Sequence, residues 1–391
     1  MINHDQVLYA DRYGLYQGHN KSKNEKLLIA FNNLFFTTFK FPQKRCAERI
    51  FFRSLVRNDY KKLFHEIASA APSETSIVIE DYLRKTTKIA PMAIFLIIKL
   101  LPLFFSFKAT NLYERVFLYI RLCFYYRIVA AVSKYNFNTL ILFADMQPVE
   151  CLLAQYFRSR GKKTVTLQHG LYADYGDYPT VNIINYLHQP SEYFLAWGRH
   201  TADLIYRTGT GRKVVICGKP SVAISSHIKP KHTAEHTYFS VILDQNIFEQ
   251  HNIDMLKLAC QYAKKASLKI NIRYHPGNNR RTYQDLARGH YVDLDLDGSL
   301  FVIGHTSSML HEMMLLGVPA FKYASDAPSV EMPDELIFTT SEQLNKLATN
   351  MNSIDFNTLA KDYISFFGQS SLERYSNFFL KLENNENIIT D

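Results

Sequence analysis

A strand–helix–strand pattern between residues 138 and 170 constrains the fold more than any other feature. The apolar run TLILFAD (residues 139–145) precedes the helical spacing of PVECLLAQYFRSRGKK, and TVTLQHG follows as a second strand. Pro148 suits the first turn of this helix and Gly161 its carboxyl end. Because a strand, a helix of about a dozen residues and a further strand form a βαβ unit, the pattern predicts a parallel sheet in an α/β fold.

The same alternation continues and then returns after a polar, histidine-rich stretch. EYFLAWG and KVVICGKP predict two more strands in the first half, and YFSVILD, LKINIRYHP, SLFVIG and VPAFKY predict four strands in a second half. We expect residues 138–220 to form one Rossmann-like core, residues 221–237 an interdomain linker, and residues 238–391 a second Rossmann-like domain with C-terminal helices. Two such halves predict two domains that face each other across a cleft.

Residues 1–137 are expected to be the mainly helical N-terminal part of the first domain. Within them, residues 89–108 (IAPMAIFLIIKLLPLFFSFK) are nearly all apolar, but Pro91, Lys99 and Pro102 interrupt the run. Its uncharged stretches are shorter than the roughly 20 residues that a membrane span requires. The next segment, NLYERVFLYIRLCFYYRIVAAV, places arginines among aromatic residues. Two interpretations stay open: two core-facing helices, or a surface whose apolar side chains enter the lipid headgroup region while Lys and Arg meet anionic lipid.

The net charge and the spacing of the cysteines limit the classes of partner and of site that we expect, and the N-terminal segment indicates the cellular compartment. The 45 Lys and Arg outnumber the 36 Asp and Glu by 9, which favours an anionic partner. No zinc-knuckle spacing, RNA-binding aromatic signature or helix-turn-helix pattern occurs, so nucleic acid is not expected. The five cysteines contain no C-x-x-C pair, so neither a metal site nor a disulfide framework is expected. The N-terminus MINHDQVLYADRYG has no apolar segment of a signal peptide, so we expect a cytoplasmic protein, with peripheral membrane binding left open.

The hydroxyl-rich turn between SLFVIG and SSMLHEMMLLG is the strongest candidate binding site. Thr306, Ser307 and Ser308 stand where the predicted helix begins, so free N–H groups, the positive end of the helix dipole and the hydroxyls would together bind a phosphate. Glu312 follows on the same helix face and is expected to accept hydrogen bonds from ribose hydroxyls. Ser and Thr are also good N-caps, and capping alone explains this turn equally well.

Histidines follow one strand in each half. In the second half, His275 precedes a turn at Pro276, and such a histidine can hydrogen-bond a phosphate, while Arg273 adds positive potential. In the first half, Asp145 and His169 fall at the carboxyl ends of neighbouring predicted strands, where ligands of parallel sheets bind. Each of these features is weak alone, because polar residues are common wherever a strand returns to water.

Taken in order, YHP, HTSSMLHEM and GVP resemble the HP and SS motifs of GT-B fold bacterial transferases that build surface polysaccharides. These include sialyltransferases, Kdo transferases of capsule assembly, and the CDP-glycerol or CDP-ribitol polymerases of teichoic acid synthesis. In that group the histidine and the serines hold the phosphate of a donor nucleotide, commonly a cytidine nucleotide. The resemblance therefore implies that His275, Ser307 and Ser308 bind the donor and that residues 238–391 form the donor domain.

The resemblance extends to the first half, from about residue 138. LQHG is similar to a histidine–glycine pair of teichoic acid polymerases, whose histidine is the proposed base, and VVICGKP is similar to a Gly-x-Pro element before the interdomain crossing. Gln168 stands where an aromatic residue is common, and His305-Thr306 replaces an acidic–aromatic pair. The acidic D/E-D/E-G element of sialyltransferases has no counterpart in the first half. These departures leave the substrate open.

The resemblance implies a metal-independent glycosyltransferase that needs no cofactor. It would transfer a sugar or polyol-phosphate from a nucleotide donor, such as a CMP-sugar, to a glycan or lipid-linked glycan in capsule or lipopolysaccharide biosynthesis at the bacterial cell surface. His169 is then expected to be the general base of an inverting reaction, oriented by Asp145 or Asp174. The alternative is that His169 positions the acceptor while Asp145 or Asp174 takes the proton. An anionic membrane surface is a further expected partner. A UDP-sugar 2-epimerase and a non-catalytic, membrane-associated polysaccharide-assembly protein are the alternatives.

Overall fold

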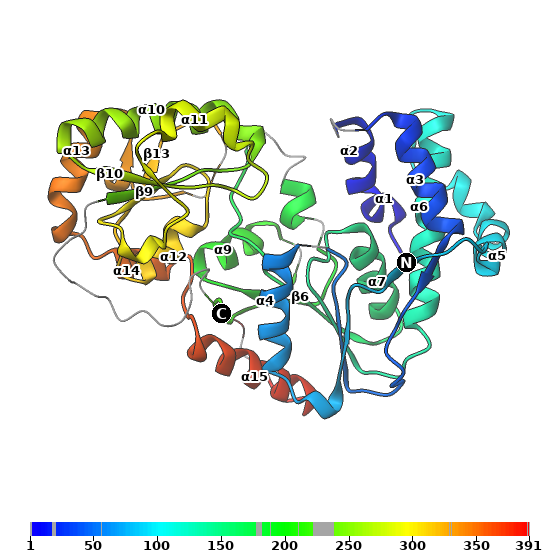
Figure 1. Cartoon of the computed structure of the whole chain (residues 1–391). Helices are drawn as coiled ribbons and strands as arrows, with labels where there is room; N and C mark the ends of the chain where they lie inside the picture. Colours follow the sequence, from blue (N-terminus) through cyan, green and yellow to red (C-terminus); the bar gives the residue numbers. More distant parts are fainter. Residues whose placement is uncertain are drawn as a thin grey trace.

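The structure is a computed structural model with two parallel sheets and helices on both faces of each (Figure 1). It describes residues 2–17, 21–55, 57–176, 182–187, 189–209, 211–221, 238–327, 329, 331–388 and 390. The predicted α/β class with two parallel sheets is confirmed. Apart from Ser221, the predicted linker at residues 221–237 lies outside the described residues.

The first sheet has six strands in the order β3-β2-β5-β6-β7-β8, and all neighbouring pairs are parallel. Its strands are β2 (Arg49–Phe52), β3 (Ser76–Ile79), β5 (Thr139–Leu142), β6 (Lys163–Leu167), β7 (Tyr193–Ala196) and β8 (Lys213–Ile216). The predicted βαβ unit is β5–α7–β6, in which α7 (Pro148–Arg158) begins at Pro148 as expected. Gly161 closes the turn after this helix with a φ of +74°, and the Lys162 N–H donates to the Phe157 carbonyl at 3.0 Å.

Two strands of this sheet come from the N-terminal segment that was expected to be mainly helical, so the sheet begins well before residue 138. Neither β2 nor β3 was predicted, because a four-residue apolar run fits a helical turn as well as a strand. The side chains of β2 alternate between the two faces of the sheet. Phe51 packs against Phe64 and Phe379, whereas Ile50 and Phe52 join the apolar cluster of the N-terminal helices.

The structure describes six α-helices in this N-terminal segment, together with a small antiparallel pair of strands. The helices are α1 (His4–Val7), α2 (Tyr9–Gln17), α3 (Lys23–Phe35), α4 (Asn58–Ser69), α5 (Pro91–Lys99) and α6 (Leu112–Val132), and the pair is β1 (Thr37–Phe39) with β4 (Leu83–Lys85). Within the described part of the chain, no helix is both long and apolar enough to cross a membrane.

The helix α6 is a core helix, which supports the first of the two interpretations for its segment. Twelve of its 21 residues are buried, and it packs against α3, α5 and α7. Its arginines bond to the protein itself. Arg121 donates to Asp11 at 2.9 Å, and Arg127 donates to the Thr37 carbonyl at 2.7 Å. These hydrogen bonds favour the core-facing interpretation for Arg121 and Arg127.

The second sheet has the order β11-β10-β9-β12-β13-β14 and is also parallel throughout. Its strands are β9 (Tyr238–Ile242), β10 (Lys269–Arg273), β11 (Tyr291–Val292), β12 (Val302–Gly304), β13 (Ala320–Tyr323) and β14 (Ile337–Phe338). Its helices are α10 (Glu249–Ala266), α11 (Gln284–Ala287), α12 (Met309–Leu315), α13 (Ser341–Asn350) and α14 (Phe356–Lys361). The edge strands β11 and β14 were not predicted, because two residues carry no readable periodicity.

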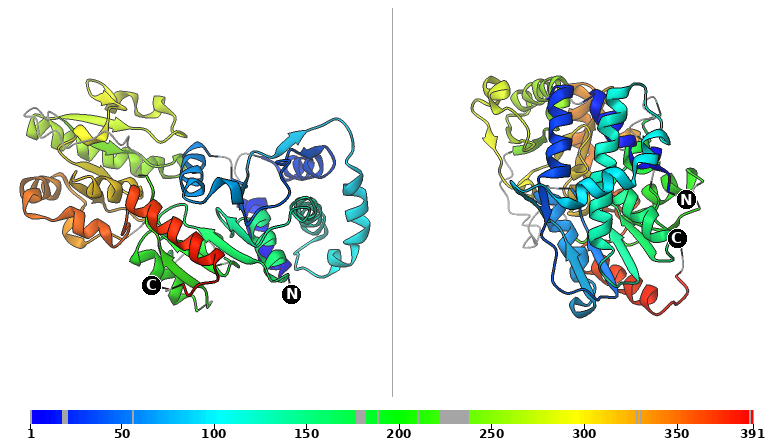
Figure 2. Two further views of the ribbon diagram at one scale, coloured as in Figure 1. Left: turned by 90° about the horizontal axis from the view of Figure 1, so that it is seen from below. Right: turned by 90° about the vertical axis from the view of Figure 1, so that its right-hand side faces the viewer.

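The last helix, α15 (Gln369–Glu383), packs on the first sheet, although it was expected with the second domain (Figures 1 and 2). The Phe379 and Phe51 rings lie 5.5 Å apart, and the Tyr375 hydroxyl donates to the Gly218 carbonyl at 3.1 Å. Gly218 has a φ of +83°, and a Cβ atom there would lie 2.2 Å from the Phe366 carbonyl oxygen. Glycine is therefore required where the chain leaves β8 beside the segment that leads into α15.

Candidate functional site

His169 follows β6 at the carboxyl edge of the first sheet and lies among aromatic rings. Its ring is 5.6 Å from Tyr60, 5.9 Å from Phe143 and 5.6 Å from Tyr172. Its Nδ1 atom is 3.1 Å from the Tyr172 hydroxyl. Its Nε2 atom has no hydrogen-bond partner among the described residues. His169 therefore has one nitrogen held by the protein and one that can meet a ligand.

Gln168 fixes the backbone that carries His169. Its side chain is fully buried, its Oε1 atom accepts from the Trp197 N–H at 2.6 Å, and its Nε2 atom donates to Thr201 at 3.0 Å and to the Gly170 carbonyl at 2.8 Å. These bonds join the carboxyl ends of β6 and β7 to α9 (Arg199–Arg207). An aromatic side chain could not make these hydrogen bonds.

The two carboxylates expected to orient His169 are hydrogen-bonded to other residues. Asp145 is fully buried and accepts from the Ser191 N–H at 2.8 Å, and burial raises the pKa of this carboxyl. Asp174 is exposed and accepts from the Asn182 side chain at 2.9 Å. Neither makes a hydrogen bond to His169. The structure gives that contact to Tyr172, a residue that the sequence analysis missed.

The surroundings of His169 make its imidazole neutral. Burial, to which the positive charge of Arg57 adds, lowers the pKa of His169 to about 4. Its charged form would lose hydration that the aromatic rings cannot replace. His169 is thus a neutral side chain at pH 7, ready to accept a proton or donate a hydrogen bond.

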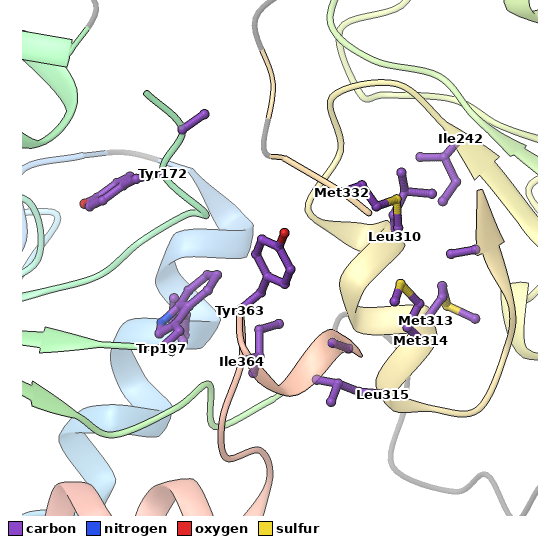
Figure 3. Packing of buried hydrophobic residues seen from close by; sticks show 14 of the residues in the cluster. Tyr172, Trp197, Ile242, Leu310, Met313, Met314, Leu315, Met332, Tyr363 and Ile364 are labelled. Atoms are coloured by element: carbon purple, nitrogen blue, oxygen red, sulfur yellow. The ribbon is translucent and has the colours of Figure 1, made fainter. Parts of the chain in front are cut away.

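A series of rings connects this edge of the first sheet to α12 in the second half. The His200 Nε2 atom lies 3.2 Å from the Tyr172 carbonyl oxygen. The His200 ring is 4.8 Å from that of Tyr363, which in turn lies 4.2 Å from His311 on α12. Figure 3 shows Tyr363 between Tyr172 and Trp197 on one side and α12 on the other. The two halves are therefore in contact next to the residues predicted to act.

The carboxyl ends of β9, β10 and β12, which are neighbours in the sheet, meet at Asp244. Its Oδ2 atom accepts from the Thr306 N–H at 3.0 Å and lies 3.2 Å from His305 Nε2. Its carbonyl oxygen accepts from the Asn278 side chain at 2.8 Å, and Asn278 in turn accepts from the His275 N–H at 2.7 Å. Asp244 therefore brings together the two turns that the sequence analysis selected separately.

His275 can act as a hydrogen-bond donor while its imidazole is neutral. Its Nδ1 atom accepts from the Gly277 N–H at 3.1 Å. Because that nitrogen acts as the acceptor, a neutral His275 carries its proton on Nε2. Pro276 is exposed in the same turn, and Arg273 is exposed at the end of β10. This turn can donate to a phosphate oxygen and supply positive potential.

Of the three hydroxyls before α12, only that of Ser307 acts as a helix cap in the described part of the chain. The helix was expected to span residues 307–317, but it begins at Met309, and Ser308 makes no side-chain cap hydrogen bond. Ser307 Oγ accepts from the Met309 N–H at 3.3 Å, which leaves its hydroxyl proton available. Thr306 Oγ1 has no hydrogen-bond partner among the described residues. Capping therefore accounts for the Ser307 hydroxyl but not for those of Thr306 and Ser308.

Glu312 lies in an ion pair between the two halves. Its Oε1 atom is 2.5 Å from Lys219 Nζ and 3.4 Å from Ser308 Oγ, and only 3% of the residue is exposed. Lys219 follows β8 and also lies over the Trp197 ring. Binding of ribose hydroxyls by Glu312 stays a prediction, and it would require the ligand to reach a carboxylate that Lys219 already holds.

Two further features lie away from these turns. A cavity of about 350 Å³ is found at the amino ends of β2, β5 and β6, on the sheet edge opposite His169, and its lining includes Arg49 and Glu383. Within the described ranges, no three His, Cys, Asp or Glu side chains are grouped so that they could hold a metal ion.

No family model and no curated protein matches this sequence, but solved structures match its fold. A Listeria monocytogenes protein, provisionally assigned as a UDP-N-acetylglucosamine 2-epimerase, has a TM-score of 0.57 at 12% identity, over 88% of this chain and 99% of that chain. The UDP-N-acetylglucosamine 2-epimerase from Rickettsia bellii has a TM-score of 0.51 at 14% identity, over 87% and 96%. The glycotransferase of kitacinnamycin has a TM-score of 0.53 at 8% identity, over 86% and 99%. The fold is of the GT-B type.

Of Asp244, Tyr172 and Lys219, which the sequence analysis missed, Asp244 could have been identified from a sequence feature. It closes the predicted strand YFSVILD as Asp145 closes TLILFAD, and the rule for carboxyl ends covers both. Tyr172 and Lys219 had no such signal, because their partners are set by the packing of loops and by contact between the halves of the GT-B fold.

Proposed function

We propose that this chain is a nucleotide-sugar-dependent glycosyltransferase that transfers a sugar or polyol-phosphate to a surface polysaccharide or glycolipid. The donor would be a cytidine nucleotide such as a CMP-sugar, and the reaction would need no metal. The proposal rests on one observation: the carboxyl edges of the two sheets, both of which carry polar side chains, are connected through a series of contacting rings. His169 lies at the edge of one parallel sheet, the His275 and Ser307 turns meet at the edge of the other, and a ring series joins them.

The second edge supplies the donor half of the proposal. His275 Nε2–H and the hydroxyls of Thr306 and Ser307 would donate to the donor phosphate oxygens. Ser308 would join them by giving up the hydrogen bond that it donates to Glu312 at 3.4 Å. These groups stabilise the charge that develops on the nucleotide as it leaves, in place of a metal ion. Arg273, exposed at the end of β10, adds positive potential. The proposal is supported by the observation that Ser308 makes no side-chain cap bond.

The first edge supplies the acceptor half. For a sugar donor, His169 Nε2 takes the proton of the acceptor hydroxyl while that oxygen attacks the anomeric carbon, and the bond from this carbon to the phosphate oxygen breaks. The nucleotide leaves with the bonding electrons, and attack from the opposite face inverts the carbon. For Nε2 to accept, Nδ1 must carry the other proton and donate it to the Tyr172 oxygen at 3.1 Å. Asp145 and Asp174 stay predictions for a supporting role.

The low pKa of His169 is compatible with proton transfer if binding of the donor raises it. A base with a pKa of about 4 is fully neutral at pH 7 but binds a proton weakly. A bound anionic donor would raise this pKa, because an opposite charge nearby favours the imidazolium. His169 would therefore become a better base only after the donor has bound.

The second candidate is a sugar-nucleotide 2-epimerase, since two of the structures that share the fold carry that name. An epimerase needs no acceptor, whereas a transferase releases nucleotide in proportion to the glycan that it forms. A non-catalytic assembly protein would bind no nucleotide at all.

The test is a transfer assay on the purified chain with CMP-, CDP- and UDP-activated sugars and a glycan acceptor fraction. We expect acceptor-dependent nucleotide release and a matching mass increase of the glycan. His169→Ala should lower turnover by at least ~100-fold, within the range typical of a general base. His290→Ala is the matched control, because His290 is half-buried beside β11 and away from both polar edges. Full turnover in a folded His169→Ala variant would refute the base, and epimerised donor without acceptor would refute the transferase.

A further inference from the structure

An apolar surface surrounds α5 and the short 3-10 helix that follows it, η2 (Leu101–Phe105). Eight of the twenty large hydrophobic side chains exposed in the described residues lie in this short segment: Ile89, Met92, Ile94, Phe95, Ile98, Leu101, Phe105 and Leu112. Ile98 is 70% and Phe105 74% exposed. So dense a group of exposed apolar side chains marks a surface that meets a partner.

The helix α5 is apolar on its exposed face as well as on its buried face. Exposing an apolar helix face to water is unfavourable. Ala93 and Leu96 are buried and face α6, as the core-facing interpretation predicts. Ile94, Phe95 and Ile98 are exposed, and Lys99 is the only charged residue of the helix. A helix on the surface of a water-soluble domain normally turns a polar face outward. The exposed side of α5 therefore has the apolar residue composition that is typical of a buried surface.

The charged side chains within the segment that carries this surface have a single sign. Residues 83–112 contain five cationic side chains and no Asp or Glu. All five are exposed: Arg84, Lys85, Lys88, Lys99 and Lys108. Apolar and aromatic side chains surrounded by lysines match a membrane interface, where the apolar groups enter below the headgroups and the lysines meet anionic phosphates.

We propose that this surface binds an anionic phospholipid bilayer. The helix α5 has nine residues and is about 14 Å long, less than half of the roughly 30 Å hydrocarbon core, so it would lie in the plane of the interface. It stands at the end of the molecule farthest from the second sheet, where a flat bilayer can reach it (Figures 1 and 2).

A second copy of this chain is the less favourable occupant. In a two-fold symmetric dimer the same surface is used on both subunits, so the five cations of one copy would face those of the other. Like charges brought together across an interface oppose association. The cationic border thus favours an anionic bilayer over self-association.

The test is co-sedimentation of the full chain with vesicles, without any donor or acceptor, so that its outcome is independent of the proposed function. Vesicles of phosphatidylcholine with 30% phosphatidylglycerol, roughly the charge of an acidic bilayer, are compared with pure phosphatidylcholine. We expect binding to the anionic vesicles that weakens as salt rises. Ile98→Ser with Phe105→Ser should weaken it at least tenfold. Ile247→Ser is the matched control, since Ile247 is 76% exposed on the second half and should have no effect.

Lys88→Gln with Lys99→Gln tests the charge separately and should lower binding to the anionic vesicles alone. The proposal is overturned if the chain binds neither kind of vesicle, or if Ile98→Ser with Phe105→Ser binds as well as the unchanged chain. It is also overturned if the unchanged chain is a dimer by sedimentation velocity, this double variant is a monomer, and neither binds vesicles.

Discussion

The sequence predicted the position of His169 at the end of a strand. It predicted neither the hydrogen-bond partner of His169 nor its pKa. Its place after β6 followed from the βαβ pattern, but its partner did not. Asp145 and Asp174, the carboxylates near it in the sequence, bond to Ser191 and Asn182, and the Tyr172 hydroxyl holds Nδ1. Burial among aromatic rings lowers the pKa of His169 to about 4. Burial by residues distant in the chain cannot be read from local sequence.

This pKa predicts the pH dependence of the reaction at the residue scale. Because the folded pKa lies below the usual value near 6.5, His169 keeps its neutral, proton-accepting form down to about pH 5. We expect kcat/KM, which reports the free enzyme, to show no loss from His169 between about pH 5.5 and 7.5. The measurement is a pH profile of transfer at low donor concentration. An acid limb near pH 6.5 that is absent from the residual activity of His169→Ala would contradict the assignment.

Secondary-structure elements were predictable where they are long or bounded by clear breaks. The helix α7 begins at Pro148, and β5, β9, β10 and β12 lie within the predicted runs. The strand β6 begins at Lys163, one residue before its predicted run. The strands β2, β3, β11 and β14 were missed, because two to four residues cannot show a period. The position of α15 was also missed. Its apolar face predicts burial, but only the folded chain shows that it packs on the first sheet.

The docking of α15 gives a prediction at the scale of one element. Phe379 is 2% exposed and packs edge-on against Phe51 of β2. Phe379→Ala should lower the free energy of unfolding by about 3–5 kcal/mol, since it leaves a cavity between helix and sheet. The neighbouring Leu380→Ala is the control, because Leu380 is 43% exposed and should cost less than about 1 kcal/mol. Urea unfolding followed by circular dichroism measures both. Equal effects of the two changes would show that α15 is not docked as described.

At the scale of the whole molecule, several contacts hold the two halves together, and the pattern of either half alone does not predict them. The Lys219–Glu312 ion pair, the Tyr363 ring contacts and the Gly218–Phe366 approach all join segments far apart in the chain. The sequence predicted two parallel sheets and a polar turn at the edge of each. It could not predict these contacts, because they depend on how one half is placed against the other.

The most direct measurement of the central claim is a calorimetric titration of the chain with CMP, CDP and UDP. We predict that a cytidine nucleotide binds and that Ser307→Ala with Ser308→Ala weakens its affinity at least tenfold, about 1.4 kcal/mol of binding free energy. This loss corresponds to one or two hydrogen bonds to a charged phosphate. Failure of all three nucleotides to bind, or equal affinity in the double variant, would contradict the account.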